Sequence, residues 1–135
     1  MAKINDLEII QIPIIENILG NIAVIENNSI PFEIKRVYYL FDIPSSSKRG
    51  GHSHKKLQQV LIAISGSFDV VLKDGVSEET ITLNKPDKGL LITHNIWREL
   101  ENFSSGAVCL VLASDIFDEA DYIRDYNEFL NSNNS

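Results

Sequence analysis

Two histidines stand two residues apart in the chain, at His52 and His54. Side chains alternate along a β-strand, so on a strand both imidazoles would face the same side. Two imidazoles that project together into a cavity suit one of two chemistries, a metal site or an acid–base pair. The spacing alone also fits surface or structural histidines, so the surrounding residues have to decide between these interpretations.

A cluster of basic residues flanks the histidine pair. Lys48, Arg49, Lys55 and Lys56 place four of the twelve Lys and Arg residues within nine positions. The chain as a whole is acidic, with a formal net charge of −7, which argues against broad binding to nucleic acid or to a membrane surface. A local basic patch in an acidic protein instead suits a small anionic group such as a diphosphate.

The segment Phe32–Phe41 mixes charged, aromatic and aliphatic residues. On a strand, Arg36 and Tyr38 would share one face, and Tyr39 and Phe41 would share the other. If the first pair faces inward, the interior is a polar site, because an Arg and a Tyr make poor core residues. If the second pair faces inward, Arg36 lies in water. The pattern leaves both arrangements open.

Short β segments separated by turns must position these residues. The segments rich in Val, Ile, Phe and Tyr are Leu7–Ile12, Asn21–Glu26, Phe32–Phe41, Leu57–Ile64, Phe68–Lys73, Glu79–Leu83, Gly89–Thr93, Trp97–Glu101 and Ala107–Ala113. Closely spaced strands without helices between them predict a β-sandwich or a closed barrel. One amphipathic helix is expected near the C-terminal end, over Asp118–Leu130, with apolar residues at 122, 123, 126, 129 and 130.

The bulk composition predicts one globular domain over residues 1–135, with 44% hydrophobic and 23% charged residues. The single cysteine, Cys109, lies in an apolar run and is expected in the core. The N-terminal segment lacks the apolar region of a signal peptide, and no apolar run reaches membrane-spanning length. We therefore expect a cytoplasmic protein.

The spacing after the histidine pair resembles the first sequence motif of the cupin superfamily, which is H-x-H, a short spacer, Glu, six residues and Gly. Gln59 stands at the Glu position and Gly66 at the Gly position. A neutral amide is a poor ligand for a hard or borderline cation. Arg98 stands about where the second cupin motif would supply a His, and its permanent charge excludes a metal, whereas His94 is offset and expected in a loop. We therefore predict proton chemistry, with no metal and no cofactor.

Several longer stretches are similar to the dTDP-sugar 3,4-ketoisomerase family. They are Ile34–Tyr39, Arg49–Leu61, Gly66–Ser67, Leu110–Ser114 and Asp118–Tyr126, in the family's order from about residue 20 to 130. The resemblance implies an all-β cupin-type jelly-roll barrel with a short C-terminal helix, usually a homodimer. It also implies conversion of dTDP-4-keto-6-deoxyglucose into a 3-keto-6-deoxyhexose, on the way to 3-amino sugars of surface glycans.

The resemblance also assigns roles to residues. His52 matches the family's catalytic position and is expected to remove the C3 proton, which the adjacent C4 ketone acidifies. His54 would relay a proton to or from the sugar oxygens, and Tyr38 would hydrogen-bond the developing enolate. The expected substrate contacts are Arg36, Arg49, Gln59, Trp97 and Arg98. The arginines suit diphosphate or sugar oxygens, whereas Trp97 either stacks on a ring or belongs to the core.

Two other functions stay open from the sequence. A cupin epimerase that acts at C3 and C5 of the same type of substrate also needs a base beside a ketone. A non-catalytic cupin that binds a sugar or a small effector is also compatible with Gln59 and Arg98, although the family resemblance favours the ketoisomerase over both. The configuration at C4 of an isomerised product depends on the face that receives the returning proton, which the sequence does not specify.

Overall fold

The structure is a computed structural model that describes residues 3–26 and 28–133. Its strands are β1 (Glu8–Gln11), β2 (Ile14–Ile15), β3 (Ile22–Ala23), β4 (Arg36–Leu40), β5 (Arg49–His54), β6 (Gln59–Ser65), β7 (Phe68–Lys73), β8 (Glu78–Leu83), β9 (Lys88–Ile92), β10 (Trp97–Glu101), β11 (Val108–Ala113) and β12 (Tyr122–Ile123). Its helical elements are the 3-10 helices η1 (Ile4–Asp6) and η2 (Glu119–Asp121) and the α-helix α1 (Tyr126–Asn133). The predicted all-β class with a short C-terminal helix is confirmed.

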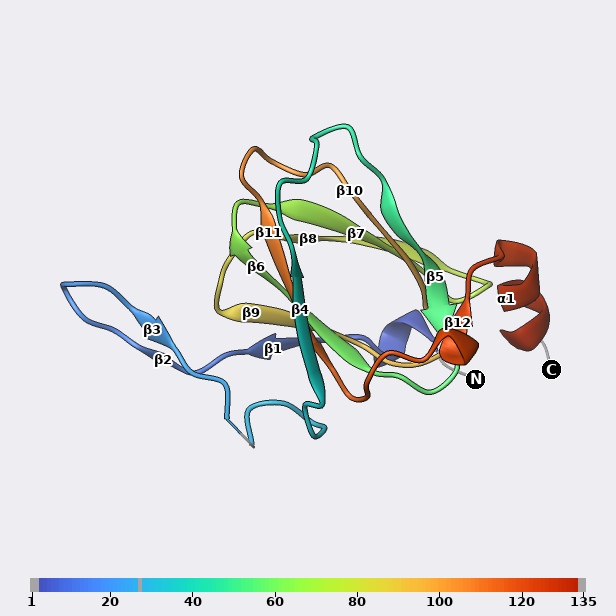
Figure 1. Ribbon diagram of the computed structural model, residues 1–135, viewed down its shortest axis with the longest axis horizontal. Coiled ribbons are helices and arrows are strands. Elements are labelled where there is room, and N and C mark those ends of the chain that lie inside the picture. Colours follow the sequence, from blue (N-terminus) through green and yellow to red (C-terminus); the bar gives the residue numbers. More distant parts are fainter. Residues whose placement is uncertain (1–2, 27, 134–135) are drawn as a thin grey trace.

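Two five-stranded antiparallel sheets face each other (Figure 1). The first has the order β1-β9-β6-β11-β4, and the second has the order β12-β5-β10-β7-β8. Hydrogen-bonded neighbours come from distant parts of the chain, as the crossovers of a jelly roll require. Leu61, Phe68, Leu90 and Val111 belong to one buried apolar cluster, and Cys109 lies in the same cluster, as predicted.

The predicted strands agree best with the observed ones where an alternating pattern ends at a turn. β7 and β10 coincide residue for residue with the predicted segments. Gly66 makes the turn between β6 and β7 with a φ of +67°, and a Cβ there would lie 2.9 Å from Ala107 Cα. A side chain is therefore excluded from this turn. β2, β5 and β12 fall outside the segments predicted as strands.

The prediction of one helix over Asp118–Leu130 is wrong in its first half. Residues 119–123 form η2 and β12, and α1 begins at Tyr126. β12 is a strand because it pairs with the end of β5, where Tyr122 lies opposite His54. The apolar residues of this segment have helical spacing, but they lie on two elements. Ile123 belongs to β12 and Phe129 to α1, and both form a buried cluster with Trp97.

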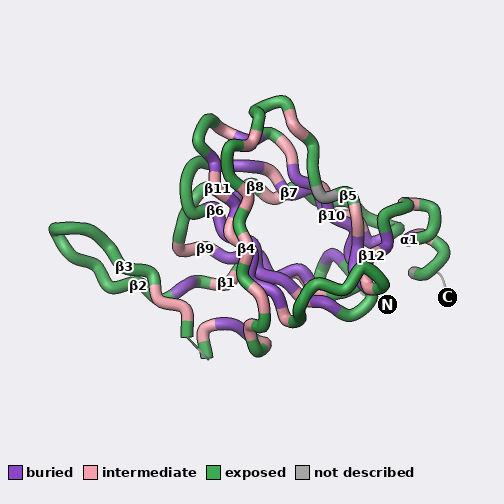
Figure 2. Tube along the Cα trace, in the orientation of Figure 1, coloured by how far each residue is buried: buried purple, intermediate pink, exposed green. Residues whose placement is uncertain are grey.

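One part of the molecule exposes many apolar side chains. The hairpin formed by β2 and β3 projects away from the sheets (Figures 1 and 2). Its exposed apolar residues are Ile14, Ile15, Ile18, Leu19 and Ile22. None of the helices in the described part of the chain is long and apolar enough to cross a membrane.

Candidate active site

Five of the predicted site residues converge between the two sheets. His52 and His54 lie on β5, and Arg98 lies opposite His52 on the neighbouring strand β10. Gln59 begins β6, and Tyr38 lies on β4, both in the facing sheet. The site is therefore assembled from four strands of the two sheets, and hydrogen bonds connect all five side chains.

The structure decides the arrangement of the Phe32–Phe41 segment that the sequence leaves open. Tyr39 and Phe41 are 60% and 61% exposed, whereas Arg36 and Tyr38 are partly buried. The edge strand β4 pairs with β11 in a register that turns Arg36 and Tyr38 toward the interior. The interior at this end of the jelly roll is therefore polar, as a binding site for a polar ligand requires.

Arg98 ties the two histidines together. Its Nε donates to His52 Nε2 at 3.0 Å, and its Nη2 lies 3.1 Å from His54 Nε2. The two Nε2 atoms are themselves 3.1 Å apart. A guanidinium has N–H donors and no acceptor, so both imidazoles present a lone pair to it. Burial lowers the pKa of Arg98 from its ordinary value, but an arginine still keeps its charge in proteins.

His54 is a neutral imidazole in this environment. Burial lowers its pKa to about 2, and the charges of Arg98, Arg36 and Arg124 act in the same direction. Its Nδ1 lies 3.1 Å from Asp121 Oδ2. The predicted relay role requires this ring to gain a second proton, and the surroundings oppose that step.

Gln59 connects Arg98 to Tyr38. Its Oε1 accepts a hydrogen bond from Arg98 Nη2, and its Nε2 donates to the Tyr38 hydroxyl at 3.0 Å. Burial raises the pKa of Tyr38, so the phenol keeps its proton at neutral pH. Because the Tyr38 oxygen accepts from Gln59, its own O–H is available as a donor to a ligand.

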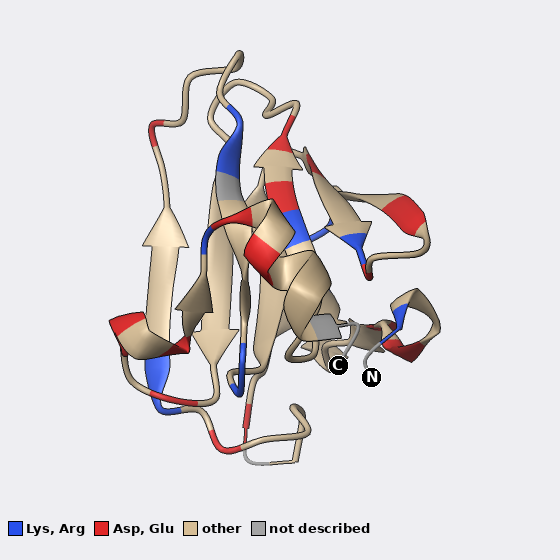
Figure 3. Cartoon of the chain, turned by 90° about the vertical axis from the view of Figure 1, so that its right-hand side faces the viewer, with Lys and Arg blue, Asp and Glu red and all other residues tan. Residues whose placement is uncertain are grey.

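A cavity lies beside His52. It is lined by Tyr38, Leu40, Arg49, His52, Gln59, Leu61, Arg98, Leu100 and Val111. Apolar walls with a few convergent polar groups are typical of a small-molecule site. Arg49 is exposed at the beginning of β5, directly after Lys48. The distribution of basic and acidic residues over the chain is shown in Figure 3.

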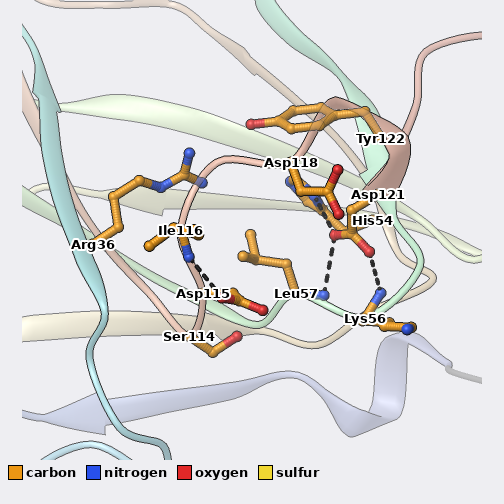
Figure 4. Close-up of a pocket in the computed structure, with 10 residues that line it drawn as sticks. All are labelled: Arg36, His54, Lys56, Leu57, Ser114, Asp115, Ile116, Asp118, Asp121 and Tyr122. Atoms are coloured by element: carbon orange, nitrogen blue, oxygen red, sulfur yellow. Dashed lines mark hydrogen bonds and ion pairs between the residues drawn. The ribbon is translucent and has the colours of Figure 1, made fainter.

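A second cavity lies beside His54 (Figure 4). Its charged lining residues are Arg36, Lys56, Asp115, Asp118 and Asp121. Arg36 Nε and Nη2 are buried and have no hydrogen-bond partner among the described residues. The Arg36 guanidinium lies 5.1 Å from the centroid of the Tyr38 ring, so this residue stands beside the first cavity without lining it.

The prediction that Trp97 contacts the substrate is not supported by its position. It precedes Arg98 on β10, so its side chain points to the opposite face of the sheet. There it is 5% exposed and packs with Ile123 and Phe129, and its Nε1 donates to Glu99 Oε2 at 2.9 Å. Of the two alternatives for Trp97, stacking on a substrate ring or packing in the core, the structure shows the second. His94 lies exposed in the turn before β10, as expected.

Two residues at the site are absent from the sequence prediction. Asp121 contacts His54, and the ring centroid of Tyr122 lies 4.4 Å from that of His54 and 5.0 Å from that of His52. Both belong to the stretch Asp118–Tyr126 that carried the family resemblance. The assignment of this stretch to a helix hid their position beside β5.

The residues around the histidine pair do not fit a metal ion. Metal-binding sites of this type surround imidazoles with carboxylates or further imidazoles. Here Arg98 directs its N–H groups at the Nε2 atoms of His52 and His54. The side chain that accepts the remaining hydrogen bond from Arg98 is the neutral amide of Gln59. The described part of the chain contains no group of three or more His, Cys, Asp or Glu residues that could hold a metal. We therefore assign no step of a reaction to a metal.

The fold and the site define a jelly-roll protein of the cupin type in which an arginine holds the histidine pair. The FdtA family, described as WxcM-like, C-terminal, matches residues 5–134. The chain therefore belongs to this family. The resemblance to the sugar 3,4-ketoisomerases inferred from the sequence is confirmed.

Similar proteins with stated activities cover most of the chain. The TDP-4-oxo-6-deoxy-alpha-D-glucose-3,4-oxoisomerase of Aneurinibacillus thermoaerophilus is 51% identical over 108 residues, which are 80% of this chain and 78% of that protein. The structure of WlaRB, a TDP-quinovose 3,4-ketoisomerase from Campylobacter jejuni, is 52% identical with a TM-score of 0.90 over 95% of this chain and 99% of that one.

The 3,4-ketoisomerase QdtA from Thermoanaerobacterium thermosaccharolyticum is 42% identical to this chain. Its structure in complex with TDP superposes with a TM-score of 0.95 over 98% of this chain and 97% of that one. A histidine-to-asparagine variant of QdtA has a structure in complex with TDP-4-keto-6-deoxyglucose, with a TM-score of 0.94 over 96% of this chain and 95% of that one.

Proposed function

We propose that this chain converts TDP-4-keto-6-deoxyglucose into a TDP-3-keto-6-deoxyhexose. The observation that carries the proposal is the hydrogen-bonded set of His52, Arg98, Gln59 and Tyr38 on one wall of a cavity. The similarity to proteins that carry out this reaction supports it. The product would carry a ketone at C3, which suits it for later amination at that carbon.

The reaction is an isomerisation that needs no oxidant or reductant. A base removes the hydrogen from C3, and the electrons of that C–H bond form the C3–C4 double bond of an enediolate. Protons then move from O3 to the solvent or to a side chain and onto O4. A proton delivered to C4 completes the product, with the carbonyl at C3 and a hydroxyl at C4.

His52 is the proposed base. It lines the cavity, and its Nε2 accepts a hydrogen bond from Arg98, so that nitrogen is unprotonated in the free enzyme. An imidazole can take up and return a proton near neutral pH. The charge of Arg98 would stabilise the negative enediolate in the same cavity.

Tyr38 is the proposed hydrogen-bond donor to the enediolate oxygen. Its hydroxyl is protonated, lines the cavity and has its oxygen held by Gln59. A donor fixed before the reaction stabilises developing charge more effectively than one that must reorganise. Gln59 would therefore act mainly through Tyr38 and Arg98.

The proposed contact for the diphosphate is Arg49. It is exposed, lines the cavity and continues the basic stretch before β5. A guanidinium offers paired N–H groups that match phosphate oxygens. Arg36 lies behind Tyr38 toward the second cavity, and we propose that it supports the site electrostatically.

We further propose that the active form is a homodimer. Ile18 and Leu19, at the tip of the β2–β3 hairpin, are 99% and 94% exposed, and contiguous apolar surface of this kind marks interfaces. A symmetric pair of chains could bury both hairpins at once. Light scattering during size-exclusion chromatography should give twice the chain mass. An Ile18→Asp/Leu19→Asp variant should give the monomer mass, whereas Val76→Asp, at a residue that is 87% exposed in another turn, should not.

The test of the proposed reaction is incubation of the purified protein with TDP-4-keto-6-deoxyglucose, followed by NMR of the sugar ring. The proposal predicts a carbonyl that moves from C4 to C3. An epimerase would keep the carbonyl at C4 while it inverts C3 or C5. A binding protein would leave the substrate unchanged, and either result would overturn the proposed reaction.

A further inference from the structure

Asp121 contacts three nitrogen atoms from β5 and the residues that follow it. Its Oδ2 lies 3.1 Å from His54 Nδ1, its Oδ1 accepts from the Lys56 backbone N–H at 2.9 Å, and its Oδ2 accepts from the Leu57 backbone N–H at 3.3 Å. The last two bonds are visible in Figure 4. The carboxylate is therefore held in place by backbone on the same segment that carries the histidine.

The main chain around Asp121 is also fixed. Its carbonyl oxygen accepts from Lys55 N at 3.0 Å, and β12 begins at the next residue and pairs with β5. The carboxylate thus approaches Nδ1 from a rigid frame. This contact spans 67 positions of the sequence.

The two sides of the His54 ring independently select the same tautomer. On one side the Arg98 guanidinium, which can only donate, lies 3.1 Å from Nε2, so Nε2 has to be a lone pair. On the other side Asp121 Oδ2, which already accepts from the Leu57 backbone N–H, lies 3.1 Å from Nδ1, so Nδ1 has to carry the hydrogen. A neutral imidazole with hydrogen on Nδ1 satisfies both neighbours.

We propose that Asp121 is a positioning residue for the isomerisation, because it holds His54 as the Nδ1–H tautomer with the Nε2 lone pair directed at Arg98 and His52. The proposal rests on the proposed function for its catalytic part. When His52 takes up the substrate proton, its Nε2–H can donate to the His54 lone pair 3.1 Å away. Asp121 and His54 then support the charged His52, much as the Asp and His of a catalytic triad act in series.

Asp118 offers a matched control. It lines the cavity beside His54, as Asp121 does, and stands three residues before Asp121 in the chain. Its Oδ1 accepts from the Ala120 backbone N–H at 3.0 Å and so caps η2. Asp118→Asn therefore removes one negative charge from the cavity and leaves the Asp121–His54 contact in place.

The direct test is nitrogen NMR of the whole protein with ¹⁵N-labelled histidine, which identifies the ring nitrogen that carries hydrogen. The wild-type protein at neutral pH should show His54 with hydrogen on Nδ1 and none on Nε2. A wild-type spectrum with hydrogen on Nε2, or on both nitrogens, would overturn the proposal without any variant.

The second test uses Asp121→Asn. An amide keeps one acceptor for Lys56 N and turns an NH₂ group toward His54 Nδ1, which favours the opposite tautomer and places an N–H against Arg98. We expect kcat to fall by about 100-fold, with KM changed less than threefold because Asp121 does not line the His52 cavity. Asp118→Asn should keep the wild-type tautomer and a kcat within about twofold.

An Asp121→Asn protein that keeps both the wild-type tautomer and the wild-type kcat would overturn the proposal. If this variant does not fold, the wild-type spectrum still decides the tautomer. A wild-type protein with the expected tautomer but no turnover would refute the proposed function, whereas an active wild-type protein with the wrong tautomer would refute the role of Asp121 alone.

Discussion

His52 and His54 lie two residues apart on one strand, and their surroundings differ in almost every respect. His52 is partly exposed on a cavity with apolar walls, whereas His54 is 2% exposed between Arg98 and the carboxylate of Asp121. Each histidine lines a different cavity. The comparison indicates that an H-x-H pair on a strand need not be a pair in function, because neighbours from other strands set the chemistry of each ring.

The sharpest way to test this difference is to replace each histidine in turn. His52→Asn removes the proposed base while it keeps a polar side chain of similar size, so kcat should fall by at least about 1,000-fold. Steady-state assays with the TDP-linked ketosugar measure this loss. His94→Asn is the matched control, because His94 is exposed in a turn, and it should retain wild-type kinetics. A His52→Asn enzyme with wild-type turnover would remove His52 from the mechanism.

The donor on the wall of the His52 cavity should give the next largest effect. Tyr38→Phe removes the hydroxyl proposed to bind the enediolate and leaves the ring in place, so kcat should fall by about 100-fold. The adjacent Tyr39→Phe serves as control, because Tyr39 lies 60% exposed on the outer face of β4 and should have no effect. Equal effects of the two substitutions would argue against a specific role for the Tyr38 hydroxyl.

A substitution of Arg49, at the edge of the His52 cavity, should affect substrate binding more than the chemical step. Arg49→Ala removes a phosphate contact, so KM should rise by about tenfold with kcat nearly unchanged. Lys48→Ala provides the comparison, because Lys48 is 74% exposed and faces Glu101 at 3.7 Å. An unchanged KM in Arg49→Ala would place the diphosphate elsewhere.

The buried histidine should be visible in the acid stability of the protein rather than in binding. The pKa of His54 is lowered to about 2 in the folded state, so below its ordinary value of 6.5 the unfolded chain takes up a proton that the folded chain does not. The free energy of unfolding should therefore decrease as the pH falls from 6.5 toward 2, by at most about 1.4 kcal/mol per pH unit from this residue. Urea unfolding of the wild type and His54→Asn across this range should give a shallower slope for the variant. Identical slopes would contradict a buried neutral His54.

Much of this account could be predicted from the sequence, and the exceptions have physical reasons. The alternation of side chains placed β7 and β10 correctly and brought the two histidines to one side. The choice of inward face for Arg36 and Tyr38 depended on pairing between β4 and β11, which local pattern cannot supply. Trp97 was ambiguous for the same reason, since its role depends on what lies across the sheet.

The largest error came from a pattern that suits two structures. The apolar spacing after Asp118 fits a helix, but pairing with β5 outweighs that preference over residues 122–123. Asp121 was missed because its contact with His54 spans 67 positions of the sequence, and an aspartate in an expected helix gives no signal of it. Composition and spacing predicted the site side chains on β5, β6 and β10. Asp121, which orients His54, is brought to the site by the pairing of the neighbouring strand β12 with β5.

The most direct test of the central claim is the fate of the hydrogen at C3 during turnover in deuterated water. Proton abstraction by His52 through an enediolate predicts that the carbonyl appears at C3 and that C4 acquires deuterium from the solvent. The His52→Asn protein should release the C3 hydrogen far more slowly. A wild-type reaction in which the carbonyl moves to C3 while C4 receives no solvent deuterium, or in which the carbonyl stays at C4, would contradict the account.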